Sequence, residues 1–175
     1  MNSAIRTFIG LGSNLENPKA QVQQALHELA ALPLCQLVAH SSLYATPPVG
    51  PQDQPDFINA VACLETHLSP LALLDQLQAL EQRHRRRRLR HWGPRTLDLD
   101  LLLYGEQTLH QPRLTIPHAH MHSRAFVLVP LDEVATALKQ PITLHQQPLN
   151  HWVAALNTSD IRRLGDTGVT TTATI

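Results

Sequence analysis

Four stretches of the chain carry apolar residues in runs or in alternation with polar ones, which is the pattern of β-strands. They span residues 7–12, 37–44, 57–65 and 97–104. In the third stretch, Phe57 and Asn59 would share one face of a sheet, while Ile58 and Ala60 would share the other. The pattern therefore predicts four strands.

Apolar residues at steps of three and four predict two longer helices. One begins at Pro18 and has its buried stripe at Val22, Ala25, Leu26, Leu29 and Leu32. The other begins at Ser69-Pro70, a capping residue followed by a first-turn proline, and runs through Glu81. Two short apolar helices are expected around residues 125–134 and 149–156.

The order of these elements is strand, helix, strand, strand, helix, strand. This βαββαβ order predicts a ferredoxin-like α+β fold, an antiparallel sheet with helices packed on it and extra short helices at the C-terminal end. A chain of 175 residues fits one domain. We assign residues 1–156 to it and expect residues 157–175, which show no packing pattern, to form a disordered tail.

Residues 45–55 break the pattern, because four prolines and a glycine fall among these eleven residues. Such a segment is neither a helix nor an interior strand. Long loops inside small domains are usually functional, so we expect this one to border a binding site.

Composition narrows the class of protein. The formal net charge is zero and the pI is about 7.2, which argues against a general nucleic-acid or membrane binder. No apolar stretch approaches the roughly 20 residues that span a bilayer, and the N-terminus lacks a signal-peptide pattern, so we expect a cytoplasmic protein. Cys35 and Cys63 are interpreted as buried inert thiols rather than a metal or redox pair.

Positive charge is nevertheless concentrated, since six of the 14 Lys and Arg residues fall between Arg83 and Arg90. A basic run of this kind is often a solvated face or a nucleic-acid patch. Here it lies in a loop next to the strand that carries Asp98 and Asp100, which favours a role in catalysis.

Asp98 and Asp100 are the strongest candidates for chemistry. Alternate residues of a strand share a face, about 6.6–6.8 Å apart along the backbone. Two carboxylates side by side among leucines need a cation to offset their repulsion. The alternatives are solvated side chains at an edge or a Lys or Arg partner; the functional interpretation is one or two Mg²⁺ ions that also bind substrate phosphates.

Phosphate groups would be bound by side chains, because the sequence has no Walker A motif. Gly10 and Gly12 do not complete a dinucleotide-binding motif and are expected to serve a tight turn. The available donors are Arg86, Arg88, Arg95, Arg113, His118 and Arg124. Phe57, Phe126 and Trp92 are candidates to stack on a flat substrate, with the Asn59 amide beside Phe57, although any one of these aromatics alone is more often a core residue.

Five segments together resemble the 6-hydroxymethyl-7,8-dihydropterin pyrophosphokinase family over about residues 6–156. They are Gly12-Ser-Asn14, Tyr44-Ala-Thr-Pro-Pro-Val-Gly-Pro-Gln-Asp-Gln-Pro-Asp-Phe-Ile-Asn-Ala60, Trp92-Gly-Pro-Arg-Thr-Leu-Asp-Leu-Asp100, Arg113-Leu-Thr-Ile-Pro-His118 and His122-Ser-Arg-Ala-Phe-Val-Leu-Val-Pro-Leu131. The resemblance implies a monomeric enzyme of folate biosynthesis that moves diphosphate from ATP, its co-substrate, to the hydroxymethyl group of the pterin.

The resemblance also implies roles for individual residues. The two Mg²⁺ ions would be held by Asp98 and Asp100. The pterin would be bound by Thr46, Pro47, Val49, Phe57, Asn59, Trp92, Asp98 and Phe126. ATP would be bound by Gln78, Glu81, Trp92, Arg95, Leu101, Arg113, Thr115, His118 and Arg124. The catalytic set would be Arg86, Arg88, Arg95, Asp98 and Asp100.

The chain departs from the family pattern at His84-Arg85-Arg86, at His91 and at Ala119, so the alignment of the arginine run is open by about a residue. No general base is assigned. Two other functions remain open from the residues alone, a nucleic-acid-binding module with a basic loop and a different nucleotide-dependent phosphotransferase.

Overall fold

The computed structural model describes residues 3–14, 17–47, 56–86 and 97–164. In this part of the chain, six strands form one antiparallel sheet in the order β10-β3-β4-β1-β5, with β2 also paired to β4. The strands are β1 (Ile5–Ser13), β2 (Cys35–His40), β3 (Tyr44–Thr46), β4 (Phe57–Thr66), β5 (Asp98–Tyr104) and β10 (Arg162–Arg163). Two small hairpins lie outside the sheet, β6 (Leu109–Gln111) with β7 (Leu114–Ile116), and β8 (Thr143–Leu144) with β9 (Gln147–Pro148).

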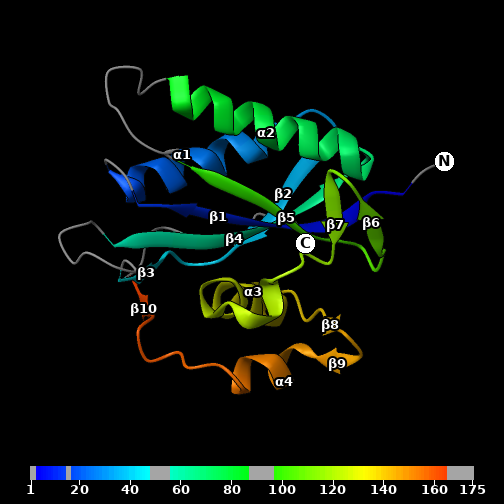
Figure 1. The fold of residues 1–175 in the computed structure, drawn as a ribbon. Helices are drawn as coiled ribbons and strands as arrows, with labels where there is room; N and C mark the ends of the chain where they lie inside the picture. The colour runs from blue at the N-terminus through cyan, green and yellow to red at the C-terminus, as the bar shows by residue number, and fades with distance from the viewer. Residues whose placement is uncertain (1–2, 15–16, 48–55, 87–96, 165–175) are drawn as a thin grey trace.

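Helices cover the two faces of the sheet unequally, as Figure 1 shows. α1 (Pro18–Ala30) and α2 (Pro70–Arg86) lie side by side on one face. α3 (Ala125–Ala137) lies on the other, preceded by the 3₁₀ turn η1 (Met121–Ser123), and α4 (Leu149–Ala154) packs beneath α3. The predicted α+β architecture is thus confirmed.

Alternation along the central strand β4 separates two hydrophobic cores. Its even-numbered residues, such as Ile58 and Ala60, pack in the core under α1 and α2. Its odd-numbered residues Val61 and Cys63 pack in the core under α3. Both faces of this strand are buried, because helices cover both sides of the sheet.

The second predicted strand, residues 37–44, is two strands instead. β2 ends at His40 and β3 begins at Tyr44. Between them the Ser41 hydroxyl accepts the backbone N–H of Val61 at 3.0 Å and donates to the Ser42 carbonyl at 2.7 Å, so a side chain replaces a ladder bond. Competition of this kind from serine interrupts regular pairing.

The arginine-rich segment was expected to be a loop, and for its first three arginines this is wrong. α2 continues to Arg86, so Arg83 and Arg85 are helical. Arginine and glutamine are good helix formers, and positive charge is favourable at a helix C-terminus. The fully buried His84 fastens this last turn to α1, with Nδ1 2.6 Å from the Gln21 side-chain oxygen and Nε2 2.5 Å from the Glu28 carboxylate.

The expectation of a tail without packing is wrong for residues 157–164. Arg162 and Arg163 form β10 and pair with Ala45 and Tyr44 of β3, and the Leu164 N–H donates to the Leu43 carbonyl at 2.9 Å. Residues 165–175 lie outside the described residues. A strand of two residues has no periodicity to detect, which is why the sequence pattern did not predict it.

Within the described ranges, no helix combines the length and the apolar character needed to cross a membrane. Both cysteines are free thiols. Cys63 is buried as expected, whereas Cys35 is only half-buried and lies 3.1 Å from the Thr66 hydroxyl.

Candidate active site

A cavity of about 660 Å³ opens on the α3 side of the sheet. Its floor comes from β1, β4 and β5, one wall comes from the start of α3, and the end of β3 and the segment before β10 close the far side. The lining residues are Gly10, Leu11, Gly12, Thr46, Pro47, Phe57, Asn59, Ala60, Asp98, Asp100, Arg124, Ala125, Phe126, Val127, Asn157, Asp160 and Ile161. Most of the predicted pterin-binding residues therefore surround one space.

Gly12 makes room for a key polar side chain on the floor. In the antiparallel register it lies opposite Asn59 on one side and Asp98 on the other. A Cβ atom at Gly12 would lie 2.9 Å from the Asn59 side-chain oxygen, whereas the nearest atoms to one at Gly10 would be those of the Leu102 side chain, at 3.5 Å. The predicted tight turn is therefore wrong, since both glycines lie within β1.

Asp98 and Asp100 both line the cavity, as expected for alternate residues of one strand. Asp98 is exposed and Asp100 is half-buried. Among the residues that the structure describes, no group of three or more His, Cys, Asp or Glu side chains is arranged to hold a metal ion. Magnesium does not need one, because it often takes one or two carboxylates and completes its shell with water and substrate phosphate oxygens. This pair, open to a cavity that could admit phosphates, fits that donor set.

His118 and Arg124 add positive or polarisable groups beside Asp100. The backbone N–H of His118 donates to the Leu102 carbonyl at 3.0 Å, which fixes His118 against β5. Burial lowers the pKa of His118, while the negative charge of Asp100 opposes this shift and Arg124 reinforces it. Electrostatics therefore couple His118 to both residues, although His118 does not itself line the cavity.

Two aromatic rings and several small polar groups border the rest of the cavity. Phe57 is half-buried, and Phe126, 39% exposed, has the Arg124 guanidinium 5.8 Å from its ring centre. The Asn59 amide is buried, with its nitrogen 3.5 Å from the Thr46 hydroxyl. The cavity thus offers apolar faces for a flat ring together with hydrogen-bonding groups for its edges.

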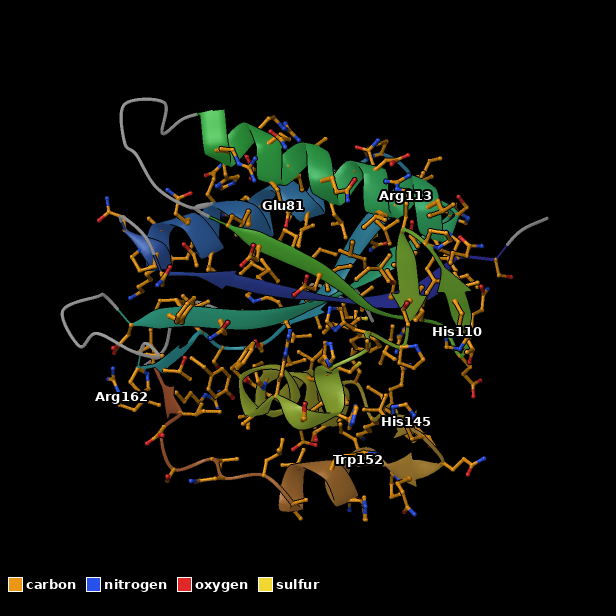
Figure 2. All side chains as sticks on the ribbon, in the orientation of Figure 1. Glu81, His110, Arg113, His145, Trp152 and Arg162 are labelled. Atoms are coloured by element: carbon orange, nitrogen blue, oxygen red, sulfur yellow. The ribbon has the colours of Figure 1, made fainter. Side chains whose placement is uncertain are left out.

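Of the residues predicted to bind ATP, those that the structure describes lie outside this cavity, with the exception of Arg124. The Glu81 carboxylate accepts the Leu99 N–H at 2.7 Å. Arg113 donates to Asp75 at 2.7 Å and to Gln78 at 3.0 Å. In Figure 2, Glu81 and Arg113 lie on the side of the sheet that α2 covers, opposite Arg162.

Leu101 cannot contribute its side chain to nucleotide binding, because it is 2% exposed in the core under α1 and α2. Thr115 lies half-buried on the short strand β7. Predicted residues outside the described ranges are Val49, Arg88, Trp92 and Arg95, and Arg86 is described only as the end of α2.

Asn157, Asp160 and Ile161 line the cavity but were not predicted as site residues. They belong to the segment interpreted as a disordered tail. The sequence indicates only weakly that this segment packs against the fold, because Ile161 and Leu164 are the only apolar residues of the otherwise polar stretch 157–164.

The chain matches a known protein family over most of its length. The family described as 7,8-dihydro-6-hydroxymethylpterin-pyrophosphokinase (HPPK) matches residues 8–136. The chain belongs to this family. The match extends from β1 through nearly all of α3, and so includes the floor of the cavity and the wall that carries Phe126.

Similar proteins carry the name 2-amino-4-hydroxy-6-hydroxymethyldihydropteridine pyrophosphokinase. The Pseudomonas aeruginosa protein is 52% identical over 159 residues, 91% of this chain and 96% of its own length. The Haemophilus influenzae protein is 55% identical over 137 residues, 78% of this chain and 86% of its own.

Among solved structures, one of HPPK-DHPS in complex with substrates has a TM-score of 0.72 at 12% identity, covering 93% of this chain. A Plasmodium falciparum HPPK-DHPS has a TM-score of 0.68 at 14% identity, covering 88% of this chain. The chain spans about half the length of both, 47% and 46%. At these identities the likeness shows a shared fold.

Proposed function

We propose that the chain transfers diphosphate from ATP to the hydroxymethyl group of 6-hydroxymethyl-7,8-dihydropterin, a step in folate biosynthesis. Membership of the HPPK family supports this, as do relatives more than 50% identical that bear the pyrophosphokinase name. The observation that carries the proposal is that Phe57, Phe126 and Asn59 share one cavity with Asp98 and Asp100.

The pterin would bind between the rings of Phe57 and Phe126. Stacking on aromatic faces suits a flat heterocycle, and the buried Asn59 amide and the Thr46 hydroxyl would pair with its edge. Pro47 would complete this part of the site, together with Val49 and Trp92, which lie outside the described residues.

ATP would bind along the outer edge of β5, which ends the order of strands in the sheet. Arg113, Thr115 and His118 come after β5 in the chain. From α2, Glu81 accepts the Leu99 N–H of β5, and Gln78 accepts a hydrogen bond from Arg113. Leu101 would contribute backbone groups, because its side chain is buried.

The transferring diphosphate would lie near Asp98, Asp100 and Arg124. These two carboxylates would hold two Mg²⁺ ions, which when bound supply positive charge that stabilises the diphosphate during transfer. Arg124 and Arg95, with Arg86 and Arg88 from the basic run, would bind phosphate oxygens.

The reaction joins the pterin hydroxyl oxygen to the β-phosphorus of ATP and breaks the bond from that phosphorus to the oxygen bridging the α-phosphorus. AMP leaves with that oxygen, and the hydroxyl proton is released. The chain's contribution is to align the two substrates and to neutralise negative charge, the two effects that dominate phosphoryl transfer.

Measurement of AMP tests the proposal. The protein is incubated with ATP and Mg²⁺, with and without the hydroxymethyldihydropterin, and AMP is quantified by chromatography. We expect AMP to form only when the pterin is present. AMP formation independent of the pterin, or none with it, contradicts the assignment.

We further propose that residues 1–156 form the pyrophosphokinase domain, extended by 157–164, and that the protein acts as a cytoplasmic monomer. The pairing of β10 with β3 supports the extension. Two free thiols are in keeping with a reducing compartment. Sedimentation at micromolar concentration tests the oligomeric state.

A further inference from the structure

One side of α2 carries a row of polar side chains that reach the strands beside it. Asp75, Gln78 and Glu81 lie three residues apart along this helix, so they occupy neighbouring positions on its surface. The Glu81 carboxylate accepts the Leu99 N–H of β5 at 2.7 Å. Asp75 and Gln78 both accept hydrogen bonds from Arg113. The row therefore joins α2 to the edge of the sheet where we place ATP.

Arg113 lies at the tip of the β6–β7 hairpin, in the two-residue turn between Gln111 and Leu114. Figure 2 shows it beside α2. Its Nη2 atom lies 2.7 Å from the Asp75 carboxylate and 3.0 Å from the Gln78 side-chain oxygen. The tip of the hairpin is thus attached to α2 through one nitrogen of the guanidinium.

The other donors of Arg113 are unused. A guanidinium has five N–H groups, two of them on Nη2, the atom that binds Asp75 and Gln78. Among the described residues, none accepts a hydrogen bond from Nη1 or Nε, which carry the remaining three. A guanidinium that is held by one nitrogen therefore offers two others to an anionic ligand, and its fork of N–H groups matches phosphate oxygens.

We propose that Asp75 is a positioning residue for the nucleotide: it orders the Arg113 side chain before ATP binds, so that the unused N–H groups of Arg113 meet the ligand. Asp75 itself does not contact ATP. This inference rests on the proposed function, in which Arg113 binds ATP. It extends the nucleotide site by a residue that the sequence pattern did not indicate.

Asp75 is the stronger of the two partners of Arg113. Its bond joins opposite charges, whereas Gln78 offers a neutral oxygen at a longer distance. Arginine has many rotamers, and fixing them when a ligand binds costs free energy. A side chain that is already ordered avoids this cost. Loss of the Asp75 charge should therefore weaken ATP binding even though Arg113 is still present.

Exposure limits the contribution of this ion pair to stability. The side chains of Arg113 and Asp75 are 49% and 61% exposed. Exposed ion pairs add little to the free energy of unfolding, because water and salt screen them. The negative charge of Asp75 also repels the phosphates of ATP, an effect that lowers the KM for ATP when the charge is removed. Ordering of Arg113 changes that KM in the opposite direction, so the sign of the change distinguishes the two effects.

Steady-state kinetics of Asp75→Asn test the proposal. The asparagine keeps a hydrogen-bonding oxygen and removes the charge. We expect the KM for ATP to rise about threefold to fivefold, the upper range for an exposed charge pair, with kcat and the KM for the pterin within about twofold of wild type. The melting temperature should stay the same. An unchanged or lower KM for ATP would overturn the proposal.

Two further variants separate the role of Asp75 from a change in net charge. Glu106→Gln removes an exposed carboxylate just beyond β5 and should leave the KM for ATP unchanged. Asp75→Glu restores the carboxylate on a longer side chain, which at an exposed position can still reach Arg113, so its KM should lie closer to wild type than that of Asp75→Asn. An equal rise in KM in Glu106→Gln, or no recovery in Asp75→Glu, would contradict the role of Asp75.

Arg113→Ala shows whether Asp75 acts through Arg113. This variant should raise the KM for ATP, and adding Asp75→Asn to it should cause no further rise, because the side chain that Asp75 orders is absent. An equal fold increase from Asp75→Asn in the presence and in the absence of the Arg113 side chain would contradict the positioning role.

Binding of an ATP analogue separates this inference from the proposed function. The analogue carries a methylene group in place of the oxygen between the α- and β-phosphorus, so the proposed transfer cannot occur. Calorimetry in the presence of Mg²⁺ should show binding to wild type that weakens about threefold to fivefold in Asp75→Asn. Wild type that neither binds the analogue nor forms AMP contradicts both proposals. Wild type that forms AMP from ATP and the pterin, with equal affinity for the analogue in Asp75→Asn, contradicts only the role of Asp75.

Discussion

The two faces of the sheet are built from the same strands but differ in how they are covered. Under α1 and α2, Ile9, Ile58 and Leu99 belong to a continuous apolar core. On the opposite face, their strand neighbours Gly10, Asn59 and Asp98 border an open cavity. A period of two therefore divides structural and functional residues between the two faces.

The functional face is itself divided along the strands. Toward one end, Phe8, Val61 and Cys63 pack under α3. Toward the other end, Gly12, Asn59 and Asp98 line the cavity together with the first three residues of α3, 125–127. The point at which α3 begins decides where the core ends and the binding site starts.

The largest effect is expected from the carboxylates of the open face. Asp98→Asn or Asp100→Asn should lower turnover by a factor on the order of 10³, because the diphosphate would lose its charge stabilisation. Thermal unfolding should change little, since Asp98 is exposed and Asp100 half-buried. Steady-state assays and melting curves check this.

Glu106→Gln is the control for these variants, an exposed carboxylate just beyond the other end of β5. It should leave turnover unchanged. Near-normal turnover of Asp100→Asn would break the assignment of chemistry to the open face.

The closed face should respond in the opposite way. Leu77→Ala, at a fully buried position of α2, should lower the free energy of unfolding by about 2–5 kcal/mol. The folded fraction should keep its kcat. Urea unfolding measures the loss, and Leu71→Ala, a partly exposed leucine of the same helix, should cost clearly less. Equal losses would contradict the packing described.

The packed half of the α3 face predicts a pH dependence of stability. Burial raises the pKa of Cys63 to about 12 from an ordinary value of 9.0. The raised pKa means that the folded protein favours the neutral thiol. The resulting contribution to the free energy of unfolding is complete below pH 9.0 and is lost as the pH rises toward 12. The loss should be about 1.4 kcal/mol per pH unit.

The free energy of unfolding of wild type and of Cys63→Ala is measured in urea at a series of pH values from 8 upward. The difference between the two proteins should shrink as the pH rises, and this change isolates the contribution of the Cys63 thiol. Cys35→Ala provides the comparison, because burial also raises the pKa of that half-buried thiol while its contact with Thr66 opposes the shift. The Cys35 dependence should be weaker. A Cys63 difference that stays constant with pH would contradict the burial of this thiol.

The smallest effect tests the floor of the cavity. Gly12→Ala would force the Asn59 side chain to shift and should raise the KM for the pterin about fivefold, equivalent to about 1 kcal/mol. Gly10→Ala, whose Cβ meets the Leu102 side chain at ordinary contact distance, should have little effect on KM. Equal KM values for both variants would show that Gly12 has no special role.

Local pattern predicted much of this molecule. The strands that contain Phe57 and Asp98, the start of α1 at Pro18 and the start of α2 after Ser69 are all as expected, and the Ser69 hydroxyl accepts the Ala72 N–H at 3.2 Å. Pattern failed where a single side chain decides the local structure. Ser41 interrupts a strand, and His84 is bound to α1 at the last turn of a helix that was expected to have ended.

By itself the sequence determined which residues could share a face. Alternation is a property of the backbone, so Asp98 and Asp100 must lie together in any strand that contains them. Only the tertiary structure decided what else reaches that face. The cavity brings Thr46, Phe126 and Asp160, far apart along the chain, around the same floor. Such contacts depend on strand order and on the packing of α3. Neither can be read from the local hydrophobic pattern of the residues that come into contact.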